Sequence, residues 1–211
     1  RLAFVRKPGA PAGKGGKAKA DAAGMPPSSI SGLADGSARF GEVDQLWVMP
    51  LDGGEAVRWT DLPLGAGTPV WFPDGRRLGF LAGRGEGRAF HSVDVHTGVT
   101  REERRIEGHI SSPPSVSPDG KSLLLIHFVS ANESYVWVYD LATREKREIE
   151  PAKVKAARSG IFSRDGKGVY IASDLGSEFR TLRYVDLASG KVTPLTDHIK
   201  WDVDDLATFG L

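Results

Sequence analysis

The chain has 211 residues, of which 28 are basic and 27 are acidic, so its formal net charge is +1. A charge this balanced gives no general attraction to nucleic acid or to an anionic membrane, and no run of about 18 apolar residues predicts a membrane span. There is no cysteine, which excludes disulfides, thiol catalysis and cysteine-bound zinc. The absence of cysteine fits a reducing compartment, so we expect a cytoplasmic protein, with the periplasm as the alternative.

The first part of the chain carries a long insertion. Residues 1–6 and 46–51 are apolar and predict two strands, and a turn at 52–54 leads into a more polar strand over residues 57–60. The insertion between the first two strands, residues 7–44, is dominated by glycine, alanine, proline, serine and lysine. Such a composition cannot bury enough apolar surface to offset the entropy lost on ordering, so we predict a long flexible loop. It is either a solvated insertion or a flap over one face of the fold.

A turn phrase then returns at intervals of 45 and 46 residues: Phe-Pro-Asp-Gly at 72–75, Ser-Pro-Asp-Gly at 117–120 and Ser-Arg-Asp-Gly at 163–166. Proline presets φ for such a turn, and glycine takes the left-handed conformation that closes a tight hairpin. The phrase is therefore predicted to join the first strand of each unit to an apolar second strand. The predicted first strands are residues 69–72, 114–117, 160–163 and 206–209, and the second strands after the phrase are residues 77–81, 122–126 and 168–171.

Each unit continues with a third apolar strand, a turn and a more polar fourth strand. The third strands align without gaps at residues 46–51, 90–95, 136–141 and 182–187. A polar fourth strand, such as residues 192–196, suits a solvated sheet edge. In the third unit Arg144 replaces the glycine of the turn, so we expect that turn to change type or to be strained.

A strand-rich repeat with a period in the forties is typical of β-propeller blades and not of helical arrays. We therefore predict an all-β fold, a partial β-propeller of about four blades of four antiparallel strands, in a single domain covering residues 1–211. The units are residues 1–68, 69–113, 114–159 and 160–205, and residues 206–211 start the next blade. We expect a section of a larger ring with open flanks. In the alternative, residues 206–209 pair with residues 2–5 and close a ring of four blades.

No catalytic, cofactor-binding or metal-binding residue is predicted. The five histidines, at positions 91, 96, 109, 127 and 198, lack the HExxH spacing that places two metal ligands on one helix face. There is no G-x-S-x-G elbow for a nucleophilic serine, and residues 13–17 lack the spacing and the final hydroxyl of a phosphate-binding loop. Asp94, Asp140 and Asp186 share one column of the third strand. A ring of carboxylates is one interpretation, but we expect these side chains to accept hydrogen bonds near the turn.

The blade phrase x-P-D-G-[KR]-x-[IL]-x-F resembles the TolB-like, or PD40, propeller repeat. The fourth unit is more specific. Residues 171–182, 186–191 and 194–196, together with residues 199–203 that follow, resemble bacterial members of the prolyl oligopeptidase family (S9) of serine peptidases.

In that family a propeller, commonly of about seven or eight blades, caps an α/β-hydrolase domain that carries a Ser-Asp-His triad. The resemblance implies a noncatalytic domain that gates substrate access in a serine oligopeptidase or an acylaminoacyl-peptidase-like enzyme. Its partners would be the α/β-hydrolase domain of the same parent chain and a peptide substrate. Some family members hold the substrate amino group with acidic residues of a propeller insertion. Glu42 and Asp44 are the residues to consider for that role, although no motif supports them.

Two other functions remain open at this point. A TolB-like module would bind protein partners on one face of the propeller. A propeller-borne enzyme such as a sugar lyase would need histidines, carboxylates and a metal clustered near the axis, but the histidines of this chain occupy different blade positions. No cofactor, nucleic acid or membrane is an expected partner, and the sequence does not determine the oligomeric state.

Overall fold

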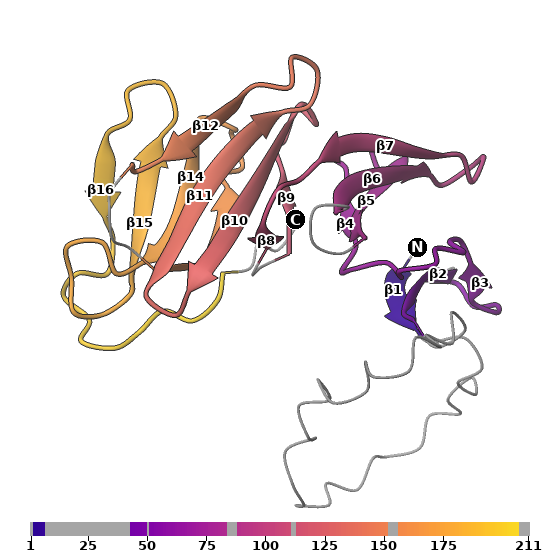
Figure 1. The fold of residues 1–211 in the computed structure, drawn as a ribbon, viewed down its shortest axis with the longest axis horizontal. Helices are drawn as coiled ribbons and strands as arrows, with labels where there is room; N and C mark the ends of the chain where they lie inside the picture. Colours follow the sequence, from indigo (N-terminus) through magenta and orange to yellow (C-terminus); the bar gives the residue numbers. More distant parts are fainter. Residues whose placement is uncertain are drawn as a thin grey trace, which may run out of the picture.

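The computed structural model describes residues 2–6, 43–49, 51–83, 88–110, 113–151 and 156–206. These residues form sixteen β-strands and no helix, arranged in antiparallel sheets that follow one another along the chain (Figure 1). The predicted all-β class is confirmed, and the repeated sheets form a partial β-propeller. Within the described ranges, no helix is long and apolar enough to cross a membrane.

The first sheet contains three strands in the order β1-β2-β3. β1 (Leu2–Arg6) pairs with β2 (Gln45–Met49), and β3 (Val57–Arg58) pairs with the other edge of β2. The insertion that separates β1 from β2 lies outside the described residues except for residues 43 and 44. The flexibility expected of it stays a prediction.

The second and fourth sheets have the four strands expected of a blade, in the orders β4-β5-β6-β7 and β13-β14-β15-β16. Each strand pairs antiparallel with its neighbour in sequence, so each sheet is a meander. The bounds are β4 (Val70–Trp71), β5 (Arg77–Ala82), β6 (Ala89–Asp94), β7 (Thr100–Arg105), β13 (Ala157–Phe162), β14 (Gly168–Ser173), β15 (Thr181–Asp186) and β16 (Val192–Pro194).

The third sheet has five strands because its first strand is split. β8 (His109–Ile110) and β9 (Ser115–Val116) both pair with β10 (Ser122–Ser130), at different places along it. β11 (Glu133–Asp140) and β12 (Lys146–Ile149) complete the sheet.

Two blades begin earlier in the chain than the turn phrase suggests. The sequence places the starts of the third and fourth units at residues 114 and 160, whereas β8 already belongs to the third sheet and β13 begins at Ala157. The phrase fixes only where a first strand ends. The residue at which the first strand starts depends on how far the second strand extends, because the backbone N–H and C=O groups of the second strand supply the hydrogen-bond partners. β10 reaches Ser130 and β14 reaches Ser173, so each pairs with residues that precede the expected boundary.

The Asp-Gly turns have the predicted backbone conformation. Gly75, Gly120 and Gly166 have φ values of 62°, 72° and 70°, in the left-handed region that glycine adopts without steric cost. The turn between β11 and β12 is strained, as expected for a non-glycine residue at its left-handed position. Arg144 has a φ of 65° there, whereas Gly98 and Gly190 at the equivalent place in the neighbouring blades both have 71°.

Three hydrophobic clusters fill the spaces between successive sheets. Side chains alternate along a strand, so Leu123 and Leu125 of β10 face the second sheet whereas Leu124 and Ile126 face the fourth. Full burial of one such side chain contributes roughly 1.5–3 kcal/mol. The sheets therefore stack face to face as blades do. The clusters include Leu46, Val48, Leu78, Phe80 and Val93 between the first and second sheets, Phe72, Phe90, Ile106, Leu123 and Leu125 between the second and third, and Leu124, Ile126, Val136, Val169 and Ile171 between the third and fourth.

Candidate functional site

The five histidines do not gather into one site. They are distributed over β6, β8 and β10, the turn after β6 and the loop after β16. His91 stacks on Phe80 with 5.6 Å between ring centroids, and His109 packs edge-on against Phe128 at 5.7 Å. Across the described part of the chain, which includes all five histidines, no group of three His, Asp or Glu side chains is placed to hold a metal ion.

His127 on β10 and Tyr139 on β11 form a polar pair on the face that packs against the second sheet. The Tyr139 hydroxyl lies 2.6 Å from Nε2 of His127, and the two rings stack at 5.9 Å. Burial lowers the pKa of His127 to about 4 and raises the pKa of Tyr139 to about 12. At neutral pH the imidazole is therefore uncharged, and the tautomer of its ring decides which of the two groups donates the hydrogen bond. The pair fixes two rings between the blades and holds no charge at neutral pH.

The aspartates of the third-strand column are turn caps, as expected. The Asp94 carboxylate accepts hydrogen bonds from the backbone N–H groups of His96 and Thr97 at 2.9 and 3.0 Å, and these bonds hold the pKa of Asp94 far below its usual value. Asp140 and Asp186 accept the equivalent bonds in their own turns, and their pKa values are also lowered. Each carboxylate serves its own hairpin, so the column does not form a carboxylate ring.

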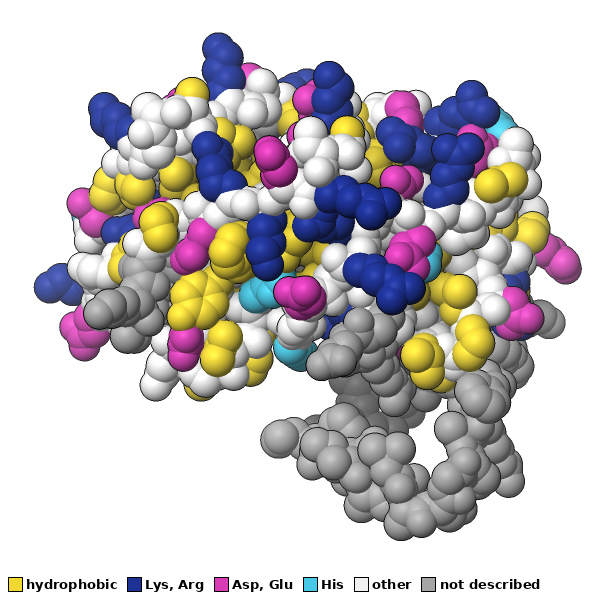
Figure 2. All heavy atoms as spheres, turned by 45° about the horizontal axis from the view of Figure 1, so that its top comes forward, with side chains coloured by type: hydrophobic (Ala, Val, Ile, Leu, Met, Phe, Trp, Pro, Cys, Tyr) yellow, Lys and Arg dark blue, Asp and Glu magenta, His cyan; other side chains and the backbone are white. Residues whose placement is uncertain are grey.

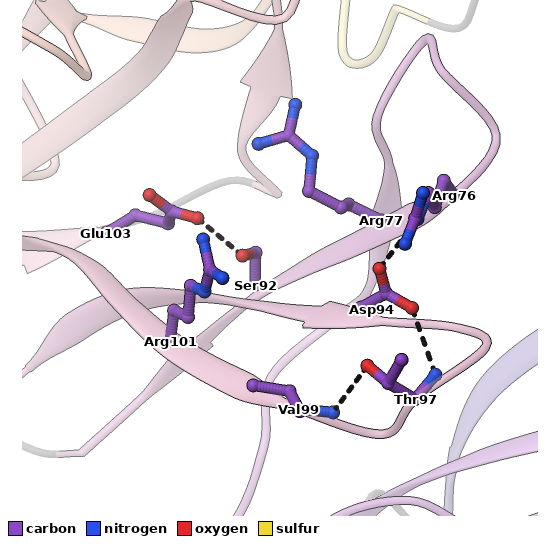
Figure 3. A pocket seen from close by; sticks show the side chains of 8 residues that line it. All are labelled: Arg76, Arg77, Ser92, Asp94, Thr97, Val99, Arg101 and Glu103. Carbon is purple, nitrogen blue, oxygen red and sulfur yellow. Dashed lines mark hydrogen bonds and ion pairs between the residues drawn. The ribbon is translucent and has the colours of Figure 1, made fainter.

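A pocket of about 520 Å³ opens on the second sheet (Figure 3). It lies on the face of β6 that carries Phe90, and Phe90 packs into the cluster shared with the third sheet. The pocket therefore occupies the side of this blade that is turned toward the next one. Its polar lining consists of Arg76, Arg77, Ser92, Asp94, Thr97, Arg101 and Glu103.

Two of the pocket arginines are fixed by carboxylates. Nε of Arg76 donates to Asp94 at 2.7 Å, and Nε of Arg77 donates to Asp74 at 2.9 Å. The Arg77 guanidinium also lies 4.1 Å from the centre of the Phe72 ring, a cation–π contact. Among the described residues, the terminal Nη groups of both arginines have no hydrogen-bond partner. They are therefore available as donors on side chains that are already oriented.

A β-bulge on β7 places Glu103 on the pocket side. Phe90 pairs with Arg104 and His91 with Glu102, so Glu103 is left without a partner residue on β6. Its carboxylate accepts a hydrogen bond from the hydroxyl of Ser92, which is buried. Arg101 lies directly opposite Ser92, on the same face.

Apart from Asp94, which was considered as part of the aspartate column, the sequence did not single out these pocket residues. The available signal is the way in which the second unit departs from the others: two arginines follow its Pro-Asp-Gly phrase, where the later units have Lys-Ser and Lys-Gly. The charges of β7 are no such signal, because a charged outer strand is expected wherever a sheet edge is solvated. Only the bulge shows which charges of residues 100–105 share a face.

Of the two acidic residues considered at the end of the insertion, the structure describes only Asp44. Glu42 lies outside the described residues. The backbone carbonyl of Asp44 accepts a hydrogen bond from the Ala66 N–H at 2.8 Å, which ties the start of β2 to the loop before β4, while the Asp44 residue is exposed.

The outward face of the fourth sheet carries two tyrosines. The rings of Tyr170 and Tyr184 lie 5.3 Å apart and line a pocket of about 370 Å³ with Leu195. Their places in the blade correspond to those of Leu124 and Val138 in the third sheet, which pack against the fourth. This face is therefore the one that a following blade would cover.

Charges of both signs are mixed over the surface. Figure 2 shows Lys and Arg side chains interspersed with Asp and Glu on the visible face, with small apolar areas between them. Ion pairs among the described residues include Arg105 with Glu102 at 3.0 Å and Arg180 with Asp204 at 2.8 Å. No single-sign field extends over this face, so recognition there depends on local groups.

Comparisons with known proteins connect the chain to peptidases and to TolB. No family model matches it. It is 29% identical over 154 residues to the uncharacterized peptidase YuxL of Bacillus subtilis, covering 72% of this chain and 22% of YuxL. It is 28% identical over 150 residues to the Tol-Pal system protein TolB of Francisella tularensis, covering 64% of this chain and 34% of TolB. A solved Mycobacterium tuberculosis puromycin-hydrolyzing peptidase matches with a TM-score of 0.57 and 18% identity, over 72% of this chain and 27% of that one.

The structural match is distant in sequence and shows the fold alone. The alignments with YuxL and TolB confirm the resemblance to a TolB-like propeller and to the propeller portion of prolyl oligopeptidase family peptidases. The chain spans only 22% and 34% of the lengths of these two relatives.

Proposed function

We propose that this chain is the noncatalytic propeller portion of a serine oligopeptidase or an acylaminoacyl-peptidase-like enzyme, and that it controls which peptides reach an α/β-hydrolase domain of the same parent chain. The alignment of 154 residues with the peptidase YuxL carries this proposal. The resemblance of the fourth unit to bacterial prolyl oligopeptidases points to the same function. Peptide hydrolysis itself would belong to the hydrolase domain.

Gating by a propeller depends on a rigid wall and needs no reactive group. The interblade clusters are closely packed, and central side chains such as Phe80, Leu123 and Val169 have no exposed surface. Interiors of this kind have low compressibility, so the openings of such a wall keep a fixed size. Short or unfolded peptides would pass, and folded proteins would be excluded by their size.

Expression of the complete coding region tests the proposal. Its product is expected to cleave short peptides and to leave folded proteins intact. Peptides of increasing length, assayed at equal concentration, measure the size limit. A complete product that cleaves neither short nor unfolded peptides would contradict the proposal.

A second candidate is a TolB-like module that binds a protein partner on one propeller face. The 28% identity to TolB over 150 residues favours it. A reading frame that ends without a hydrolase domain, and a product that forms a stable complex with another protein, would support this function instead of gating.

We also propose a cytoplasmic location, based on the absence of cysteine. Fractionation of the native cells beside a periplasmic marker protein tests this. Recovery of the protein with the marker would contradict it.

A further inference from the structure

We propose that the pocket on the second sheet binds a small zwitterion, a free amino acid or a short peptide, by its carboxylate and its ammonium group. The inference stands on the side chains of the pocket alone. It does not depend on the proposed gating function.

Among the described residues, two charged side chains that line the pocket form no ion pair, and they are one cation and one anion. Arg76 is paired with Asp94 at 2.7 Å, and Arg77 is paired with Asp74 at 2.9 Å. Within the described structure, the Arg101 guanidinium has no ion-pair or hydrogen-bond partner. Among the residues that the structure describes, the Glu103 carboxylate receives a hydrogen bond only from the neutral hydroxyl of Ser92. A ligand that complements these two residues carries opposite charges itself.

The carboxylate of the ligand fits the arginine side. Figure 3 shows the Arg77 and Arg101 guanidinium groups projecting on the pocket side of the sheet. Guanidinium groups present paired N–H donors that match the two oxygens of a carboxylate. Asp74 and Phe72 hold Arg77 in place, so little conformational freedom is lost when its Nη groups bind.

The turn of the neighbouring blade lies beside this arginine. A Cβ atom added at Gly120 would lie 3.5 Å from an Nη atom of Arg77, which is an ordinary van der Waals distance. The Arg77 guanidinium therefore extends next to the Asp-Gly turn of the third blade, at the boundary between the two blades.

The ammonium group of the ligand fits the glutamate side. The bulge turns Glu103 into the pocket, and the buried hydroxyl of Ser92 restricts its carboxylate. A hydrogen bond between an ammonium group and this carboxylate would be charge-assisted and stronger than one between neutral groups. Arg101 and Glu103 are two residues apart on one strand, which suits the short separation of the two charges in an amino acid or a dipeptide.

The size and polarity of the pocket agree with such a ligand. Its volume of about 520 Å³ falls within the range of ordinary small-molecule sites. Its polar lining does not favour a purely apolar molecule of the same size.

Titration of the chain with three related probes tests the inference. Glycylglycine carries both charges, N-acetylglycine carries only the carboxylate, and glycinamide carries only the ammonium group. Backbone amide shifts of residues 99–103 in NMR spectra report binding at the pocket. Because each charge-assisted contact contributes independently, glycylglycine is expected to bind roughly ten-fold more tightly than either single-charge probe. Equal affinity for N-acetylglycine and glycylglycine would overturn the dipolar site.

Matched variants locate the binding. Arg101→Gln and Glu103→Gln are each expected to weaken glycylglycine binding about ten-fold. Arg105→Gln is the control, because it makes the same change of charge on the same strand, where Arg105 pairs with Glu102 and lies opposite Ala89. Thermal melting checks that each variant is folded, and the exposed Arg101 is the safer of the two pocket positions. Glycylglycine affinity unchanged in Arg101→Gln would refute the assignment.

Discussion

The guanidinium of Arg183 on β15 lies 3.0 Å from the carboxylate of Glu150, in an ion pair between the third and fourth sheets. Only 14% of the Arg183 side chain and 3% of the Glu150 side chain are exposed. Glu150 also has a φ of 51°, in the left-handed region that costs a non-glycine residue roughly 1–3 kcal/mol. The ion pair therefore ties a strained residue at the end of β12 to the next blade.

Breaking this ion pair is expected to be costly. Arg183→Met leaves the Glu150 carboxylate buried without its guanidinium partner, which typically destabilises a protein by about 3–5 kcal/mol. Glu150→Gln in the Arg183→Met background removes the buried carboxylate charge and should recover part of the loss. Urea denaturation measures the free energies of unfolding. A loss below about 0.5 kcal/mol in Arg183→Met would show that the pair does not hold the two blades together.

Replacing Arg144 by glycine is expected to stabilise the chain. The residue has a φ of 65°, and relief of its steric strain should outweigh the extra freedom of glycine in the unfolded chain by about 0.5–1 kcal/mol. Ala142→Gly in the same turn is the control, because Ala142 does not have a positive φ. It should destabilise the chain or leave its stability unchanged. Equal effects of the two substitutions in thermal and urea melts would contradict the assignment of strain to Arg144.

Gly79 on β5 is expected to tolerate no side chain. A Cβ atom there would lie 2.4 Å from Cζ of Phe90, which is buried in the cluster between the second and third sheets. Gly79→Ala should destabilise the chain by about 1–3 kcal/mol through overpacking. Phe90→Leu, combined with Gly79→Ala in a double-mutant cycle, should relieve part of that cost. Strictly additive effects would show that the two positions do not meet.

The stability of the chain is expected to depend on pH through His127. Its pKa is about 4 in the folded state against 6.5 ordinarily, because burial disfavours the charged ring. As pH falls, the unfolded chain therefore takes up the proton first. The stability contributed by the neutral ring is fully present above pH 6.5 and is lost progressively as pH falls from 6.5 toward 4.

His127→Gln isolates this effect. Glutamine offers the Tyr139 hydroxyl both a donor and an acceptor but does not titrate, so the decline in the free energy of unfolding over this pH window should be shallower than in the parent chain. His91, whose pKa is also lowered, is unchanged in the variant and contributes equally to both curves. Parallel curves would mean that His127 is not the titrating group.

The repeat and its turns could be predicted from the sequence because their chemistry is local. The left-handed φ of Gly120 and of Arg144 follows from the position of each residue within its own turn, without knowledge of any distant contact. The hydrogen bonds accepted by Asp94 are local in the same sense. Blade boundaries are different, because β8 and the start of β13 are defined by pairing with strands that follow them in the chain.

The pocket could not be predicted for a related reason. Residues 101–105 read Arg-Glu-Glu-Arg-Arg, and regular strand alternation would place Arg101, Glu103 and Arg105 on one face, but the bulge at Glu103 changes which side chains share a face. Arg77 joins the site from a different strand, β5, where it lies opposite Asp94 of β6. Both features depend on how the strands pair in the folded sheet, and the charged sequence of β7 alone does not show that pairing.

We propose that residues 1–211 gate a catalytic domain and perform no hydrolysis themselves. Labelling the product of the complete coding region with a fluorophosphonate, followed by peptide mapping in a mass spectrometer, tests it most directly. The account predicts one labelled serine, located after residue 211, and no labelled residue within this chain. A labelled serine within residues 1–211, or a complete product with no reactive serine, would contradict it.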